Sequence, residues 1–167
     1  LFLVVILTST VFAMATGIVG AAVTVLGIMA SPIMNKSGYD AELSAGAITA
    51  GGTLGILIPP SVMLIVMGPV LGVSVADLYA AAFGPGFMLA FFYLAYLMGR
   101  AFLNPKLGPP VPLDERIHST ATILKEVALG VIPLAALITA TLGSILGGLA
   151  TPTEASAVGA IGALLLA

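Results

Sequence analysis

The sequence predicts an all-α membrane protein, a polytopic helical bundle with a re-entrant helical hairpin and a broken transmembrane helix. Of its 167 residues, 60% are hydrophobic and only 7% are charged, and the mean hydropathy is +1.22. A soluble domain needs roughly 25% charged residues, so a soluble globular domain, a disordered chain and a nucleic-acid binder are all excluded. The chain also has 20 glycines and 11 prolines, which indicates irregular backbone inside the bilayer.

The first element is the hairpin, because residues 1–35 carry no charge but are too long for one crossing. Thr16, Gly17 and Gly20 interrupt this run in the middle. Each arm would then have roughly 15 residues and span about 22 Å, less than the hydrocarbon core of about 30 Å. We therefore expect a re-entrant hairpin with its tip at membrane depth, surrounded by protein or water. One tilted helix with a glycine bend is the alternative.

The second element is a broken helix within the charge-free residues 43–76. Pro59 and Pro60 have no backbone N–H, and Pro60 pushes Pro59 out of the helical region. A helix that begins near Ala41, with Asp40 as its N-cap, must therefore unwind before Pro59. This break should free several carbonyl groups near the bilayer centre.

Two further charge-free runs, residues 78–99 and 127–153, are long enough to cross the bilayer. Between them, residues 100–126 hold four of the five basic residues, so this segment is expected on the cytoplasmic side. It opens as a proline-rich linker and continues into a helix expected to lie along the membrane surface. We expect His118 there to be solvated rather than a ligand.

Sidedness follows from counting crossings back from the cytoplasmic segment. Residues 68–77 then lie outside and residues 36–42 inside, which puts all five basic residues on one side. Ser74 and Asp77 have the spacing of a capping box.

Because the chain starts without Met and ends in an apolar run, we expect an internal fragment of a longer protein. We expect three parts along the chain. Residues 1–99 hold the hairpin, the broken helix and the next helix, and form part of a transport domain. Residues 100–126 form a cytoplasmic linker and an interfacial helix, and residues 127–167 form transmembrane helices that open a second half.

Candidate binding residues occur at the two breaks, and nothing in the sequence indicates an enzyme. The chain has no P-loop, HExxH, GxSxG or Cys/His cluster. The breaks instead offer hydroxyl groups, glycines and freed carbonyls, and secondary transporters bind Na⁺ and anionic substrates where such helix ends meet. We expect Na⁺ as the coupling ion at these breaks, without assigning its ligands. No cofactor is expected. The candidate ion- and substrate-binding residues are Thr16, Gly17, Gly20, Thr53, Gly55, Pro59, Pro60 and Ser61.

Glu154 is the only candidate for a charge within the membrane, and it lies beside Pro152 at an expected helix end. We interpret it as a charge that stabilises a helix N-terminus, with Thr151 or Thr153 as the cap. A role in proton coupling is the alternative.

Three stretches resemble the large membrane (permease) subunit of tripartite ATP-independent periplasmic (TRAP) transporters. The most specific is the string Gly-Thr-Leu-Gly-Ile-Leu-Ile-Pro-Pro-Ser at 52–61, with residues 72–78 behind it; the others are 34–40 and 150–155. Many members carry Ser-Gly-Ser-Ser at the hairpin tip, whereas this chain has Thr-Gly-Ile-Val-Gly at 16–20. Fewer hydroxyl groups at the tip shift the expected cation ligation toward backbone carbonyls.

The resemblance implies an elevator-type secondary transporter in the bacterial inner membrane. Such a subunit imports small organic acids that carry a carboxylate, driven by a Na⁺ gradient. Its partners would be a small TRAP membrane subunit and a periplasmic substrate-binding protein, and no nucleic acid. The alternative is a structural or channel-like membrane subunit without its own ion-coupled site, in which both breaks are packing kinks.

Overall fold

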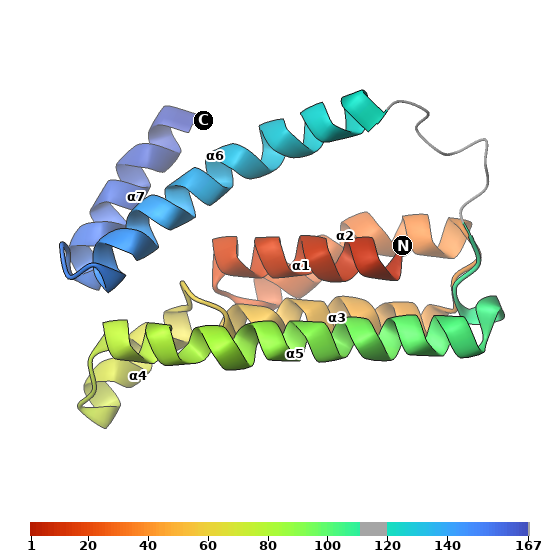
Figure 1. The fold of residues 1–167 in the computed structure, drawn as a ribbon, viewed down its shortest axis with the longest axis horizontal. Helices are drawn as coiled ribbons and strands as arrows, with labels where there is room; N and C mark the ends of the chain where they lie inside the picture. The colour runs from red at the N-terminus through yellow and green to blue at the C-terminus, as the bar shows by residue number, and fades with distance from the viewer. Residues whose placement is uncertain (111–119, 167) are drawn as a thin grey trace.

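The computed structural model describes residues 1–110 and 120–166, and its regular elements there are all helical (Figure 1). In this part of the chain, three helices are long and apolar enough to cross a membrane, and a bent pair forms a fourth candidate span. The predicted all-α membrane fold is confirmed. In order, the elements are α1 (Phe2–Thr16), α2 (Val19–Lys36), α3 (Ala41–Leu57), α4 (Val62–Leu71), α5 (Val75–Leu103), the 3₁₀ turn η1 (Pro105–Leu107), α6 (Thr120–Leu146) and α7 (Pro152–Leu166).

The expected hairpin is formed by α1 and α2, which lie side by side and run in opposite directions (Figure 1). Both arms pack on α3, and α5 runs back along α3 in the opposite direction. At 15 residues, α1 is shorter than a span, whereas α2 has 18 residues and reaches the length of one. The two-armed shape is therefore confirmed, whereas the expectation that each arm is too short to span is wrong for α2. The re-entrant position of the tip stays a prediction.

The turn between α2 and α3 ties the base of the hairpin to the rest of the bundle. Asp40 is the N-cap of α3, as expected, and its Oδ1 accepts a hydrogen bond from the backbone N–H of Leu43 (2.8 Å). The ring of Tyr39 packs edge-on against Phe2, with 4.9 Å between ring centroids. The backbone N–H of Asp40 also donates to the carbonyl of Leu107 in the linker after α5 (3.1 Å). The linker thus closes over this end of the bundle.

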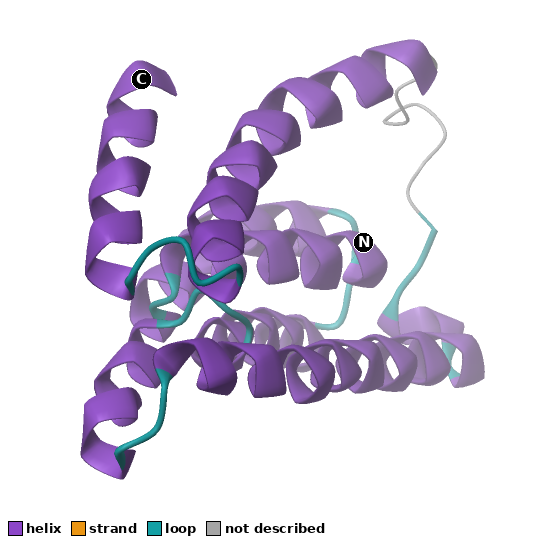
Figure 2. Ribbon diagram, turned by 60° about the vertical axis from the view of Figure 1, so that its left-hand side comes forward, coloured by secondary structure: helices purple, strands orange, loops and turns teal. Residues whose placement is uncertain are grey.

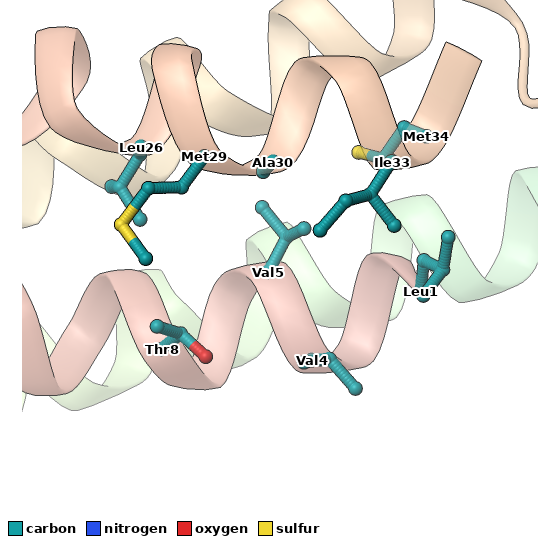
Figure 3. A pocket seen from close by; sticks show the side chains of 9 residues that line it. All are labelled: Leu1, Val4, Val5, Thr8, Leu26, Met29, Ala30, Ile33 and Met34. Atoms are coloured by element: carbon teal, nitrogen blue, oxygen red, sulfur yellow. The ribbon is translucent and has the colours of Figure 1, made fainter. Parts of the chain in front are cut away.

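An apolar hollow of about 140 Å³ lies between the two hairpin arms, toward their base. Figure 3 shows Val5 of α1 opposite Met29 and Ile33 of α2. Thr8 supplies the one hydroxyl among the side chains that line it. The base of the hairpin therefore offers little to a polar ligand, and the polar groups of interest lie at its tip.

The helices α6 and α7 form a second pair, joined by a short turn (Figure 2). α6 runs without interruption from Thr120 to Leu146, so the helix expected on the membrane surface before residue 127 is not a separate element. His118, which we expect to be solvated rather than a ligand, lies outside the described residues. Ser74 is the N-cap of α5, but its side chain makes no capping hydrogen bond, so the predicted capping box with Asp77 is wrong.

Candidate functional site

The tip of the α1–α2 hairpin is built on Gly17. This residue ends α1 with a left-handed φ of 59°, and its N–H donates to the carbonyl of Ala13 (2.9 Å). Glycine adopts this conformation without the strain that a side chain would add. The hydroxyl of Thr16 donates to the carbonyl of Phe12 (3.0 Å), so toward a ligand it can only accept a hydrogen bond or coordinate a cation.

The second break separates α3 from α4. α3 ends at Leu57, Pro59 and Pro60 follow, and α4 begins at Val62 with its axis bent by 42°. Since neither proline has an N–H, the α3 hydrogen-bond ladder cannot continue through them. The prediction that the helix unwinds before Pro59 is confirmed.

Several carbonyl groups are left open at these two helix ends. In the described part of the chain, no backbone N–H donates to the carbonyl oxygens of Gly55, Leu57 and Ile58. The same holds for Ala15 and Thr16 at the end of α1. Each helix C-terminus also carries a partial negative charge from its aligned peptide dipoles. Both ends are therefore suited to a cation.

The hairpin tip and the α3–α4 break meet at the same end of the bundle (Figure 1). A Cβ placed on Gly17 would stand only 2.8 Å from the carbonyl oxygen of Pro60. A Cβ on Gly55 would stand 3.5 Å from the carbonyl oxygen of Ala13. The structure therefore brings together the tip and the break, two segments that lie about 40 residues apart in the sequence.

Small residues along α1 and α3 make this approach feasible. Gly51 and Gly55 have the GxxxG spacing on α3, and Ser9 and Ala13 face them from α1 at the same spacing. Small residues of this kind let membrane helices pack with their backbones close together. The Gly51-x-x-x-Gly55 spacing is visible in the sequence, but the sequence does not show that Ser9 and Ala13 face it.

Contacts from α5 hold the break from the opposite side, a role that the sequence did not reveal. Tyr79 is fully buried, and its hydroxyl donates to the carbonyl of Ser61 (3.3 Å). The buried hydroxyl of Ser61 donates in turn to the carbonyl of Ile56. Gly86 leaves room for Ile58, whose Cγ1 lies 2.8 Å from where a Cβ on Gly86 would stand. The polar groups of the break are thus fixed in position by buried contacts.

Two of the predicted site residues, Gly20 and Thr53, do not face the contact between the hairpin tip and the α3–α4 break. Gly20 is exposed, and a Cβ there would have nothing within 4 Å. The hydroxyl of Thr53 donates to the carbonyl of Ala50 (2.6 Å) and lies 3.5 Å from the hydroxyl of Tyr93 on α5. Gly17, Gly55, Pro60 and Ser61 are therefore brought together, while Gly20 and Thr53 lie outside that group.

The breaks carry no charged side chain, since the nearest residues on either side are apolar, small or hydroxylated. Within the described ranges, no three His, Cys, Asp or Glu residues come close enough to hold a metal ion. A cation at the breaks would therefore be held by backbone carbonyls and hydroxyl oxygens. The N-termini of α2 and α4 start at the same place and would favour an anionic group.

Glu154 forms a capping box at the start of α7. Its Oε2 accepts from both the backbone N–H (2.7 Å) and the hydroxyl (2.8 Å) of Thr151. The backbone N–H of Glu154 lies 3.4 Å from the Thr151 hydroxyl oxygen. This reciprocal pattern satisfies groups that a helix N-terminus otherwise leaves open. The expected cap is thus Thr151 and not Thr153.

Comparison with known proteins gives a consistent result. The family described as "Tripartite ATP-independent periplasmic transporter, DctM component" matches residues 1–167. The chain is 33% identical to the C4-dicarboxylate TRAP transporter large permease protein DctM of Rhodobacter capsulatus, over 93% of this chain and 37% of that protein. It is 31% identical to the ectoine TRAP transporter large permease protein TeaC of Halomonas elongata, over 94% and 35% respectively. It is 33% identical to the 2,3-diketo-L-gulonate TRAP transporter large permease protein YiaN of Escherichia coli, over 81% and 30%.

The chain thus spans about a third of the length of these curated relatives. Their names describe transporter permease subunits, so this is not an enzyme family. The apolar helices that are long enough to cross a membrane agree with such a membrane subunit. The chain belongs to the DctM family, the large permease components of tripartite ATP-independent periplasmic transporters.

Proposed function

We propose that the full protein imports small organic acids across the bacterial inner membrane and that Na⁺ binds where the hairpin tip meets the α3–α4 break. The observation that carries this proposal is the contact between Gly17 and Pro60, which brings two helix C-termini with open carbonyls to one place. Secondary transporters use such unwound carbonyls and half-helix C-termini to coordinate Na⁺. The site lacks a carboxylate, so a cation bound there keeps a net positive charge that attracts an anion.

The substrate class rests on the helix N-termini and on the relatives. The N-termini of α2 and α4 place open N–H groups beside the candidate cation site, which suits a carboxylate. Two of the relatives are named for a C4-dicarboxylate and for 2,3-diketo-L-gulonate. A carboxylate held between these N–H groups and the cation would couple substrate binding to Na⁺ binding.

The family description also supports the expected partners. The description names one component of a tripartite periplasmic transporter, which leaves room for two partners, and we propose that these are a small membrane subunit and a periplasmic substrate-binding protein. Three basic residues lie at the end of the bundle away from the hairpin tip: Lys36 ends α2, Arg100 is in the last turn of α5, and Lys106 follows in η1. By the positive-inside rule, that end faces the cytoplasm of a bacterial cell.

The test straightens the break in the full-length transporter, reconstituted with its partners in vesicles. Changing Pro59→Ala and Pro60→Ala together restores two N–H donors, so the helix can run on and consume the open carbonyls. Half-maximal uptake should then need at least about tenfold more Na⁺, a penalty of about 1.4 kcal/mol. Pro32→Ala is the control, because Pro32 is an exposed proline inside α2, near the base of the hairpin and away from the break.

Protein level and membrane insertion are measured in parallel, so that loss of the protein is not mistaken for loss of the site. Normal uptake with unchanged Na⁺ dependence in the double variant would contradict the proposal. The breaks would then be packing kinks, and the structural or channel-like subunit would be the better reading.

A further inference from the structure

Tyr79 lies where α4, α5, α6 and α7 meet. It is fully buried in an apolar cluster with Leu142 and Ile145 of α6 and Ala155 of α7, and Ile65 of α4 packs against the same cluster. The turn between α6 and α7 lies beside the start of α5, and Tyr79 is one turn into that helix (Figure 2). The ring is therefore held in place by the second pair of helices as well as by its own.

The hydroxyl of Tyr79 reaches the α3–α4 break. It donates to the carbonyl of Ser61 (3.3 Å), and in the described part of the chain this is the one hydrogen bond between α5 and residues 58–61. The same carbonyl also accepts from the backbone N–H of Ile65 (3.3 Å). Because a carbonyl oxygen has two lone pairs, these two donors occupy it. The carbonyl of Ser61 is therefore not among those left open for a cation.

Ser61 belongs to the stretch of the break that touches the hairpin tip. A Cβ on Gly17 would stand 2.8 Å from the carbonyl oxygen of Pro60, 3.3 Å from the nitrogen of Val62 and 3.5 Å from Cα of Ser61. Tyr79 is thus hydrogen-bonded to the middle residue of that stretch. Since peptide groups are planar and rigid, a shift of Ser61 carries its two neighbours with it and changes their contact with the tip.

A cavity of about 170 Å³ separates this stretch from part of the second helix pair. Pro60 and Tyr79 line it together with Thr141 of α6 and with Pro152 and Ser156 of α7. Close packing normally holds a buried segment in place, but Pro60 borders an open space on the side of α6 and α7. The hydrogen bond from Tyr79 therefore supplies a restraint that packing does not supply there.

We propose that Tyr79 is a positioning residue for the candidate Na⁺ site, which links the α6–α7 pair to the break and keeps the open carbonyls there in place for the cation. This inference rests on the proposed Na⁺ site and deepens it, since it makes the affinity depend on a residue and a helix pair outside the two breaks. Tyr79 acts through Ser61 and not by binding the cation. Without its hydroxyl, the ring keeps its cluster, and Ser61 can shift into the space that the cavity offers.

Tyr79→Phe tests the hydroxyl alone, because phenylalanine keeps the buried ring. Sodium titrations of uptake, with the full-length transporter and its partners in vesicles, give the Na⁺ concentration for half-maximal uptake and the maximal rate separately. The half-maximal concentration should rise about threefold or more, the size of effect that one lost hydrogen bond gives, while the maximal rate and the protein level change little. Tyr96→Phe is the control, because it makes the same change on α5 at a tyrosine that is 61% exposed, and it should shift neither quantity.

Double variants test the path from the second helix pair to the tip, because residues that act through one another have non-additive effects. Gly17→Ala already separates the tip from the break, so adding Tyr79→Phe to it should change Na⁺ dependence little further. Leu142→Ala withdraws support from the ring and should also raise the half-maximal Na⁺ concentration, but by much less when Tyr79→Phe is present. Ile132→Ala, at a residue of α6 that is 63% exposed, should have no effect in either background.

The two proposals can be told apart when they fail. Unchanged or lower half-maximal Na⁺ in Tyr79→Phe, with the Pro59→Ala and Pro60→Ala double variant shifted as expected, would overturn the role of Tyr79 and leave the Na⁺ site standing. Additive effects of Leu142→Ala and Tyr79→Phe would overturn the link to the α6–α7 pair. Uptake by the unaltered protein that ignores Na⁺ would refute the sodium coupling itself, and the role of Tyr79 with it.

Discussion

The carbonyl oxygen of Pro60 lies 2.8 Å from the position that a β-carbon on Gly17 would occupy. The hairpin tip therefore leaves no room for a side chain, and the obstacle is backbone that cannot rotate away. Gly17 also has a φ of 59°, which costs a residue with a side chain about 1–2 kcal/mol. The tip and the break fit together only because this residue is glycine.

Gly17→Ala should accordingly push the tip away from the break. If Na⁺ binds between them, the concentration for half-maximal uptake should rise about tenfold or more, while the protein still inserts. Gly20→Ala is the matched control three residues later, where a Cβ meets nothing within 4 Å and should leave Na⁺ dependence unchanged. Equal effects of the two variants would show that the tip–break contact has no part in cation binding.

Thr53→Val tests whether that hydroxyl helps to hold the cation. The hydroxyl already donates to Ala50 and faces Tyr93 rather than the tip. We expect a shift in Na⁺ dependence of threefold at most, or about 0.6 kcal/mol, smaller than for the double proline variant. Sodium titrations of uptake for both variants decide this. A Thr53→Val shift as large as that of the prolines would place Thr53 among the ligands.

Sidedness can be checked with single cysteines at Ser37 and Ser74. These residues lie in the turn after α2 and in the loop before α5, at opposite ends of the broken span. An impermeant thiol reagent added to intact cells should label Ser74→Cys and spare Ser37→Cys. After the membrane is opened, both should react. Labelling of Ser37→Cys alone from outside would invert the topology.

Glu154→Gln separates a capping role from a role in proton coupling. Glutamine can still accept hydrogen bonds at the third position of the helix, so the contacts from Thr151 can survive the change. Protein level, uptake and the ion dependence of uptake should all stay normal. Loss of ion dependence at a normal protein level would assign Glu154 to coupling instead.

The breaks could be predicted because their causes are local in the sequence. Two adjacent prolines stop a helix wherever they occur, and Asp40 before a helical run is a good N-cap. The hairpin followed from the length of the apolar run and the interruption at 16–20. Each of these conclusions needs only neighbouring residues and the thickness of the bilayer.

The parts that could not be predicted depend on which faces meet. Nothing in the sequence shows that Tyr79 reaches back to Ser61, 18 residues away, because α5 could rotate about its axis without changing its hydropathy. The same applies to Tyr93 and Thr53, which are 40 residues apart. The residue type of Gly20 and its place near the tip predict a site residue, but the open side of Gly20 faces away from the break. Apolar composition specifies that a helix lies in the membrane, whereas small residues and hydroxyl groups specify its neighbours.

The contact between Ser9 and Gly51 offers a test of how the hairpin is held on α3. A Cβ on Gly51 would stand 2.6 Å from the Cβ of Ser9, so Gly51→Ala must separate the two helices. Overpacking of this kind typically costs about 1–3 kcal/mol. In a helix the same change should otherwise be favourable by roughly 1 kcal/mol, because alanine has the higher helix propensity.

Gly51→Ala should therefore lower the thermal unfolding temperature of the purified full-length protein and weaken Na⁺ dependence together, as the tip moves off the break. Ser9→Gly removes the side chain that the new Cβ would strike, so the double variant should regain much of both losses. Gly46→Ala, on an open face of α3, should cause neither loss. If Ser9→Gly fails to rescue Gly51→Ala, the damage does not arise at the α1–α3 contact, and the hairpin is held to the broken helix by other means.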